Sequence, residues 1–195
     1  MGLGVALSVS ANLGTSPISS LPYVLSVVTP LSMGFMTLIM NTVFIGIQAL
    51  ILKKKFKLWY LLQFPGLLLF SISIDLNNYL LSGLLPDVYW QQFGIMLLGC
   101  VVLGFGVALL LKADFFMMPG DFLIRIIADF TRSKNFGRVK ICFDAALVAI
   151  AVIVSLLCLH EVVGVREGSL VAALTIGLIV NFFRRYLNRI RIPSA

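Results

Sequence analysis

Ionisable and amide side chains inside long apolar runs are the residues of this chain that could do chemistry. Asp144 and Asn41 lie within such runs, and Asp121 and Arg125 stand four residues apart just after a proline. A charged residue inside a spanning helix is costly and marks a substrate or ion pathway by default. We therefore predict that Asp144, Asp121 and Arg125 form the ionisable core of a pathway, with Asn41 as a polar lining residue. The alternative is structural, because a first-turn acid stabilises a helix start and buried charges are usually paired.

A second group of polar residues stands before two short apolar segments. Thr15 and Ser16 precede a proline and offer hydroxyl and backbone donors, and Asn12 and Asp114 occupy equivalent positions before the two segments. A helix N-terminus exposes unpaired N–H groups and the positive end of the helix dipole. We predict that these four residues line the same pathway. The alternative is that both short helices lie flat at the interface and only fill gaps.

Catalytic and metal chemistry find little support in the sequence. The chain has one histidine, and its three cysteines lie in apolar runs without the spacing of metal ligands. A G-x-G sequence lies inside two apolar helices rather than after a strand, so it indicates close helix packing and not a nucleotide site. Intramembrane aspartyl proteases use a G-x-G-D motif, and the Met118-Pro119-Gly120-Asp121 sequence lacks its first glycine. We predict a protein without catalytic residues, metal or cofactor.

Composition indicates a polytopic membrane protein of the all-α class. Hydrophobic residues make up 60% of the 195 residues and charged residues 12%, about half of the share in soluble domains. No Asp, Glu, Lys, Arg or His occurs in the first 52 residues. The apolar runs predict six transmembrane helices and two short helices, re-entrant or interfacial. The predicted spans are roughly 1–12, 34–52, 60–81, 91–112, 138–159 and 168–187, and the short helices are 17–29 and 119–130.

One motif occurs twice, at an offset of 102 residues. Beyond this motif the two halves still correspond, at slightly larger offsets: Asn41 corresponds to Asp144, and Asp75 corresponds to Asn181. Each copy holds three spans, and an odd number means that the second copy enters the membrane from the opposite side. We predict a single membrane domain over 1–195, built from inverted repeats at 1–85 and 91–190. The identical pairs are Gly2/Gly104, Gly4/Gly106, Val5/Val107, Ala6/Ala108, Leu7/Leu109, Ala11/Ala113, Pro17/Pro119 and Leu21/Leu123.

Charge placement sets the predicted orientation. With the lysine-rich loop 53–57 in the cytoplasm, every Lys and Arg except Arg166 lies on the cytoplasmic side, as the positive-inside rule requires. Both termini are then cytoplasmic, segment 17–29 faces outward and segment 119–130 faces inward. The net charge of +7 therefore reports topology rather than nucleic-acid binding.

The doubled pattern G-x-G-V-A-L…A-[ND]…P resembles the YczE/YyaS/YitT family of bacterial integral membrane proteins. The match covers nearly the whole chain, including the first proline at Pro17, the Pro119-Gly120-Asp121 sequence and the later stretch from Gly137 to Asp144. The resemblance implies a multi-pass protein of the bacterial inner membrane, with permease activity among its expected functions. Relatives often carry an acidic residue just after the proline; Asp121 fits this pattern, whereas the first copy has Ser19.

These features together predict a small-solute permease with a path between the two repeats. Transport would be facilitated, ion-coupled or driven by a partner ATPase. The expected partners are the lipid bilayer, a small-molecule substrate and further copies of the chain in a homo-oligomer, with no nucleic acid. The alternative function is a non-transporting membrane protein that binds a lipid or a partner protein. A permease requires Asn41, Asp144 and the starts of the short helices to converge, whereas a scaffold leaves them separately paired.

Overall fold

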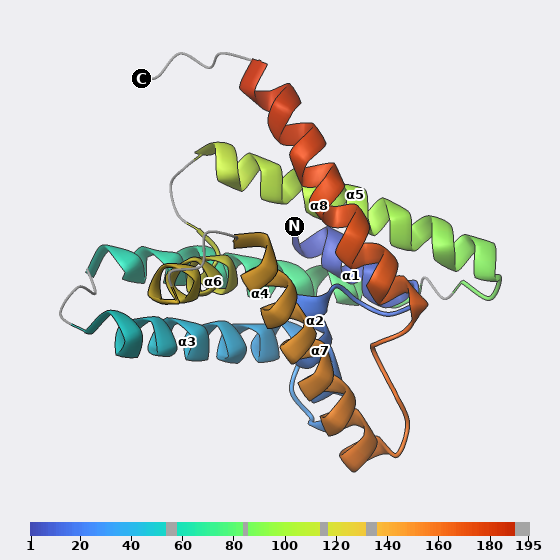
Figure 1. Cartoon of the computed structure of the whole chain (residues 1–195). Coiled ribbons are helices and arrows are strands. Elements are labelled where there is room, and N and C mark those ends of the chain that lie inside the picture. The colour runs from blue at the N-terminus through green and yellow to red at the C-terminus, as the bar shows by residue number, and fades with distance from the viewer. Residues whose placement is uncertain (54–57, 84–85, 114–116, 132–135, 190–195) are drawn as a thin grey trace.

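The computed structural model describes residues 1–53, 58–83, 86–113, 117–131 and 136–189, which form helices joined by short loops (Figure 1). No strand occurs in these ranges, which confirms the all-α class. The helices are α1 (Gly2–Ser10), α2 (Pro17–Val28), α3 (Met33–Leu52), the 3-10 turn η2 (Leu58–Leu62), α4 (Gln63–Leu80), α5 (Tyr89–Ala113), α6 (Pro119–Phe130), α7 (Phe136–Leu159) and α8 (Glu167–Arg189).

Five helices are long and apolar enough to cross a membrane, and they correspond to the last five predicted spans. Together with the composition, they indicate a membrane protein. The spanning segments are Met33–Leu52, Tyr60–Leu80, Tyr89–Ala113, Gly137–Leu159 and Glu167–Leu187.

The predicted first span, over 1–12, is not matched by a helix of spanning length. Helix α1 covers nine residues, which gives about 14 Å at 1.5 Å per residue, against a hydrocarbon core of roughly 30 Å. The helix ends because Asn12 (φ 52°) and Gly14 (φ 102°) adopt left-handed backbone. A Cβ atom on Gly14 would collide with Ser169 Oγ, so this turn is pressed against the start of α8. The described residues therefore contain five candidate spans, where the sequence predicted six.

Small residues let α1 pack closely against α5. A Cβ atom on Gly4 would lie 2.6 Å from Leu103 N and 2.8 Å from Gly99 O, which leaves no room for a larger side chain. Val5 and Leu103 are buried in one cluster with Ile74 of α4. In the first copy, the G-x-G sequence therefore serves helix packing, as predicted.

Most helix pairs in the first half of the chain have a matching pair in the second half. Helix α1 packs against α4, and α5 packs against α8, while α1 and α5 also pack against each other. The short helices α2 and α6 each lie against both α3 and α7. Helices α3 and α4 run side by side and pack against each other, whereas α7 and α8 make little contact (Figure 1). Helices α7 and α8 are also the least buried of the five candidate spans.

The two short helices form as predicted, and each begins at a proline. Helices α2 and α6 both have 12 residues, with Pro17 and Pro119 in their first turns, where the fixed φ and missing N–H of proline suit a helix start. Figure 1 shows α6 end-on while α3 is seen from the side, so α6 crosses α3 at a steep angle. This crossing brings the start of α6 to the packed interface of α3 and α7.

Candidate functional site

The start of α6 is the point at which three helices bring polar side chains together. Along α6 the apolar residues Leu123 and Ile124 are buried, whereas Asp121 remains partly exposed. Leu123 packs in one cluster with Phe44 of α3 and Leu147 of α7. This packing fixes the first turn of α6, and with it Asp121, beside α7.

An acid–lysine–acid cluster joins α6 to α7. Lys140 Nζ lies 3.4 Å from Asp121 Oδ1 and 3.5 Å from Asp144 Oδ2. Lys140 and Asp144 are four residues apart on α7, the spacing at which helix side chains meet. The Asp144 side chain is 22% exposed, against 40% for Lys140. Both distances exceed the roughly 2.7–2.9 Å of a strong charge-assisted hydrogen bond. The single positive charge of the ammonium faces two carboxylates, so it cannot neutralise both when both are ionised.

Two buried oxygen atoms have no hydrogen-bond partner among the described residues: Asp144 Oδ1 in the cluster and Gln48 Oε1 on α3. Gln48 of α3 is fully buried, and its Nε2 donates a 2.9 Å hydrogen bond to Pro119 O, at the start of α6. An unpaired buried acceptor costs about 1–3 kcal/mol, so such positions are places for water, an ion or a ligand. Both oxygen atoms therefore have acceptor capacity that no described residue uses.

Lys140 and Gln48 were missed by the sequence analysis, although both had a signal. Lys140 was counted only as a topology charge, but its spacing from Asp144 is that of a helical ion pair. Gln48 is an amide in an otherwise apolar run, the same signal that identified Asn41.

Arg125, the third predicted member of the ionisable core, and Asn41, a predicted lining residue, have other partners. Arg125 is exposed, and its Nη1 lies 3.8 Å from Met117 Sδ. Asn41 is buried, and its Nδ2 donates a 2.8 Å hydrogen bond to Thr37 O one turn earlier in α3. The structure therefore joins Asp121 to Asp144 through Lys140, but it pairs Asn41 within its own helix, so the convergence that a permease requires is met for Asp144 and the start of α6 and not for Asn41.

Thr15 and Ser16 are buried at the start of α2 and bond within the protein. Thr15 N and Oγ1 lie 3.1 Å and 3.4 Å from Gly164 O, and Ser16 Oγ donates a 2.9 Å hydrogen bond to Ser19 Oγ. These bonds dock the loop before α2 onto the loop between α7 and α8. The two hydroxyls thus stabilise the start of α2 in the present conformation.

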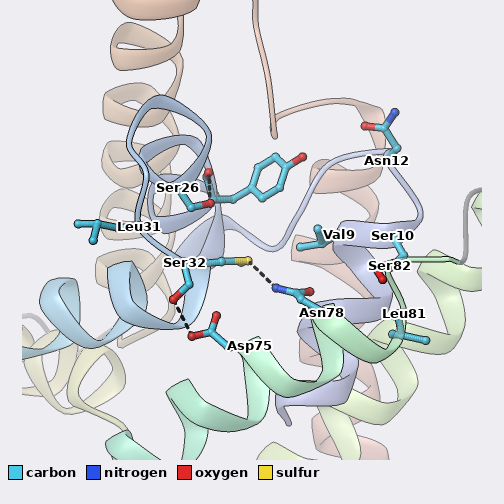
Figure 2. Close-up of a pocket in the computed structure, with 12 residues that line it drawn as sticks. Val9, Ser10, Asn12, Ser26, Leu31, Ser32, Asp75, Asn78, Leu81 and Ser82 are labelled. Carbon is cyan, nitrogen blue, oxygen red and sulfur yellow. Dashed lines mark hydrogen bonds between the residues drawn. The ribbon is translucent and has the colours of Figure 1, made fainter.

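Asn12 lies in the same loop and is exposed. Its backbone oxygen accepts a 3.1 Å hydrogen bond from Arg166 Nη1, and its side chain lies at the rim of a pocket (Figure 2). Asp114, its equivalent in the second copy, lies outside the described residues.

This separate pocket has a volume of about 570 Å³ and opens where the end of α1, the start of α3 and the end of α4 meet (Figure 2). Asp75 of α4 accepts hydrogen bonds from Ser32 Oγ (2.6 Å) and Gly34 N (2.7 Å), so it caps the start of α3. Asn78 follows on the same helix, and its buried Oδ1 has no hydrogen-bond partner among the described residues. Tyr23 lines the pocket from α2, and burial raises the pKa of its phenol, which therefore stays neutral.

Comparison with known proteins gives the family. The model of a family of unknown function, DUF6198, matches residues 1–185. The chain belongs to the DUF6198 family. It is 27% identical over 195 residues to the uncharacterized protein YyaS of Bacillus subtilis (strain 168), across 97% of this chain and 89% of YyaS. The similarity to YyaS confirms the resemblance predicted from the doubled motif. No solved structure matches the chain.

The DUF6198 match includes both the acid–lysine–acid cluster and the pocket beside Asp75, since it extends through both copies of the motif. The two sites lie at different places in the fold. The cluster joins α6 to α7, and the pocket joins α1, α3 and α4.

Proposed function

We propose that this DUF6198 protein is a small-solute permease of the bacterial cytoplasmic membrane, with its path between two inverted repeats, α1–α4 and α5–α8. The observation that carries the proposal is reciprocal packing between equivalent positions. Gly4 contacts Leu103, and the equivalents of these residues, Gly106 and Met1, also contact each other. A two-fold relation generates paired contacts of this kind. Helix α1 then stands where a sixth span would stand, opposite α5.

A contact between the two short helices supports the same two-fold relation between the repeats. A Cβ atom on Gly120 would lie 2.5 Å from Ile18 Cδ1, and these two residues are equivalent at the 102-residue offset, each directly after its proline. A residue that contacts its own equivalent lies close to a two-fold axis. The first turns of α2 and α6 thus meet near this axis, as half-helices do in inverted-repeat transporters.

Contacts among helix ends agree with the proposed orientation. The end of α1 bonds to the start of α8 through Leu13 O and Gly168 N (2.9 Å), on the side predicted to face outward. The ends of α5 and α8 meet where Lys112 Nζ donates a 2.7 Å hydrogen bond to Leu187 O, on the side predicted to be cytoplasmic. This grouping supports an arrangement with both termini on one side of the membrane, which the positive-inside rule assigns to the cytoplasm.

In this proposal Asp144 is the central residue of the path. Its unpaired Oδ1 accepts a hydrogen bond or proton from the passing solute, while Lys140 holds Oδ2. Gln48 Oε1 offers a second acceptor at the start of α6. When Asp144 takes up a proton, Lys140 still has Asp121 as a charged partner, so no isolated charge remains. A carboxylate in this position therefore suits coupling of transport to protons.

Uptake into proteoliposomes tests the proposal, with a radiolabelled sugar, monocarboxylate, neutral amino acid and primary amine as separate probes. We expect one class to enter faster than into protein-free vesicles. Asp144→Asn should slow this uptake by at least about tenfold, because the variant can no longer exchange a proton at that site. The matched control is Asp129→Asn, the same change at an exposed residue of α6.

Two results would contradict parts of the proposal. Unchanged uptake by Asp144→Asn removes Asp144 from the mechanism. If folded wild-type protein moves none of the four probes, the permease function itself is rejected and the lipid- or partner-binding alternative takes its place.

A further inference from the structure

We propose that the pocket beside Asp75 is a binding site for small organic cations that carry several N–H donors, such as alkylammonium or guanidinium compounds. The pocket volume of about 570 Å³ lies within the roughly 300–1,000 Å³ of small-molecule sites. The inference rests on the proposed permease function only for the onward path of the ligand, because binding itself depends on the pocket alone.

Charge is the first argument. Asp75 is the one charged residue among the described residues that line the pocket, and none of them is Lys, Arg or His. The nearby Arg166 lies outside the lining; it is 3.7 Å from Glu167 Oε1 and donates to Asn12 O. The pocket therefore presents a carboxylate without a basic side chain in its lining, which favours a cationic ligand.

The hydroxyl groups of the pocket give the second argument. Ser26 donates its proton to Tyr23 O (2.7 Å), and Ser82 donates to Tyr79 O (2.8 Å). Ser32 donates to the Asp75 carboxylate (2.6 Å). With their protons engaged, these three hydroxyls can offer a ligand only their oxygen lone pairs. These three hydroxyls therefore add acceptors to the Asp75 carboxylate, to which the N–H groups of a cationic ligand can donate.

Asn78 gives the third argument. Its Nδ2 lies 3.8 Å from Met33 Sδ, while its buried Oδ1 has no hydrogen-bond partner among the described residues. Figure 2 shows Asp75 and Asn78 projecting from α4 toward the start of α3, with the Asn78 oxygen on the side of the amide away from Asp75, so the two residues place a carboxylate and an amide at the same pocket. The ring of Tyr23, also in the lining, adds an aromatic surface of the kind that attracts cations.

The capping role of Asp75 is compatible with ligand binding. Each carboxylate oxygen has two lone pairs, and the bonds from Ser32 Oγ and Gly34 N use one on each oxygen. Further acceptor capacity therefore remains for a ligand, and the cap holds the carboxylate in a fixed orientation.

Isothermal titration calorimetry on the full chain in nanodiscs tests the inference. The probes are propylammonium and methylguanidinium, with propionate and propionamide as the anionic and neutral comparators of similar size. We expect saturable binding of at least one cation and of neither comparator. Asp75→Asn should weaken that binding by at least about tenfold, because it removes the charge but keeps the size of the side chain.

Two further variants make the test specific. Asn78→Ala removes the unpaired acceptor without touching the α3 cap, so it should weaken cation binding severalfold even if Asp75→Asn perturbs folding. Glu161→Gln removes a negative charge from an exposed residue outside the pocket lining, and it should bind as wild type does.

Absence of cation binding by the wild type, equal binding of propionate or propionamide, or full affinity in both Asp75→Asn and Asn78→Ala would overturn the inference. Cation binding without uptake into proteoliposomes would sustain the site and reject the permease. Uptake of another solute without cation binding would reject the site and leave the permease in place.

Discussion

Residues with unusual environments gather where α3, α6 and α7 meet. The sequence allowed Asp144 and Asp121 to be predicted, since an ionisable residue in an apolar run is visible without a structure. It could not show that Lys140 would bridge them, because a lysine near a helix end serves equally well as a topology signal. Arg125 was predicted in the core from its spacing alone, and in the structure it contacts Met117 instead.

The bridging role of Lys140 predicts measurable coupling between Lys140 and Asp144. In a double-mutant cycle of Lys140→Met and Asp144→Asn, we expect the two changes to be non-additive by about 0.5–1 kcal/mol, a modest value because both groups are partly exposed. Thermal unfolding in detergent measures it. The same cycle with Asp129→Asn in place of Asp144→Asn should be additive, and additivity in both cycles would contradict the bridge.

Gly34 and Gly46 of α3 offer a matched pair of substitutions. A Cβ atom on Gly34 would collide with Ser71 O and lie 2.6 Å from the Asp75 carboxylate, whereas one on Gly46 would meet nothing within 4 Å. We expect Gly34→Ala to lower the free energy of unfolding by about 1–3 kcal/mol through overpacking. Gly46→Ala should raise it by up to about 1 kcal/mol through helix propensity. Equal effects in denaturant titrations would contradict the close crossing of α3 and α4.

At the scale of elements, apolar runs and prolines were sufficient to predict most helices. The two short helices begin at Pro17 and Pro119 as expected, because proline favours the first helical turn. The predicted span at 1–12 corresponds to α1, which ends two residues earlier, at Ser10, before the left-handed backbone at Asn12 and Gly14, and which is too short to be a candidate span. That turn depends on contacts with the start of α8, far away in the sequence, so local patterning could not reveal it.

Gln48 ties α6 to α3, and this tie can be tested by hydrogen exchange. Gln48→Met removes the bond from Nε2 to Pro119 O while keeping a similar volume. We expect faster amide exchange in a peptide over 119–130 and unchanged exchange in α8. The control is Gln92→Met, because Gln92 Nε2 makes a similar 2.9 Å bond to Pro86 O elsewhere. Unaltered exchange at 119–130 would show that the bond does not hold α6.

At the scale of the whole molecule, the packing joins the two halves of the chain. Helix α2 packs on α7 and α6 packs on α3, so each short helix lies against the other half of the chain. Sequence predicted the equivalence of the halves, but it could not predict their difference. Helices α3 and α4 are packed together, whereas their equivalents α7 and α8 make little contact.

The charged cap at the start of α3 has no charged equivalent in the second half, where Asn181 corresponds to Asp75. Hydrogen bonds to a charged group contribute about 1.5–3 kcal/mol, against about 0.5–1.5 kcal/mol for neutral ones. A permease of the proposed kind would therefore alternate between conformations of unequal energy. In such a permease, separating α3 from α4 would cost more free energy than separating their equivalents, α7 and α8.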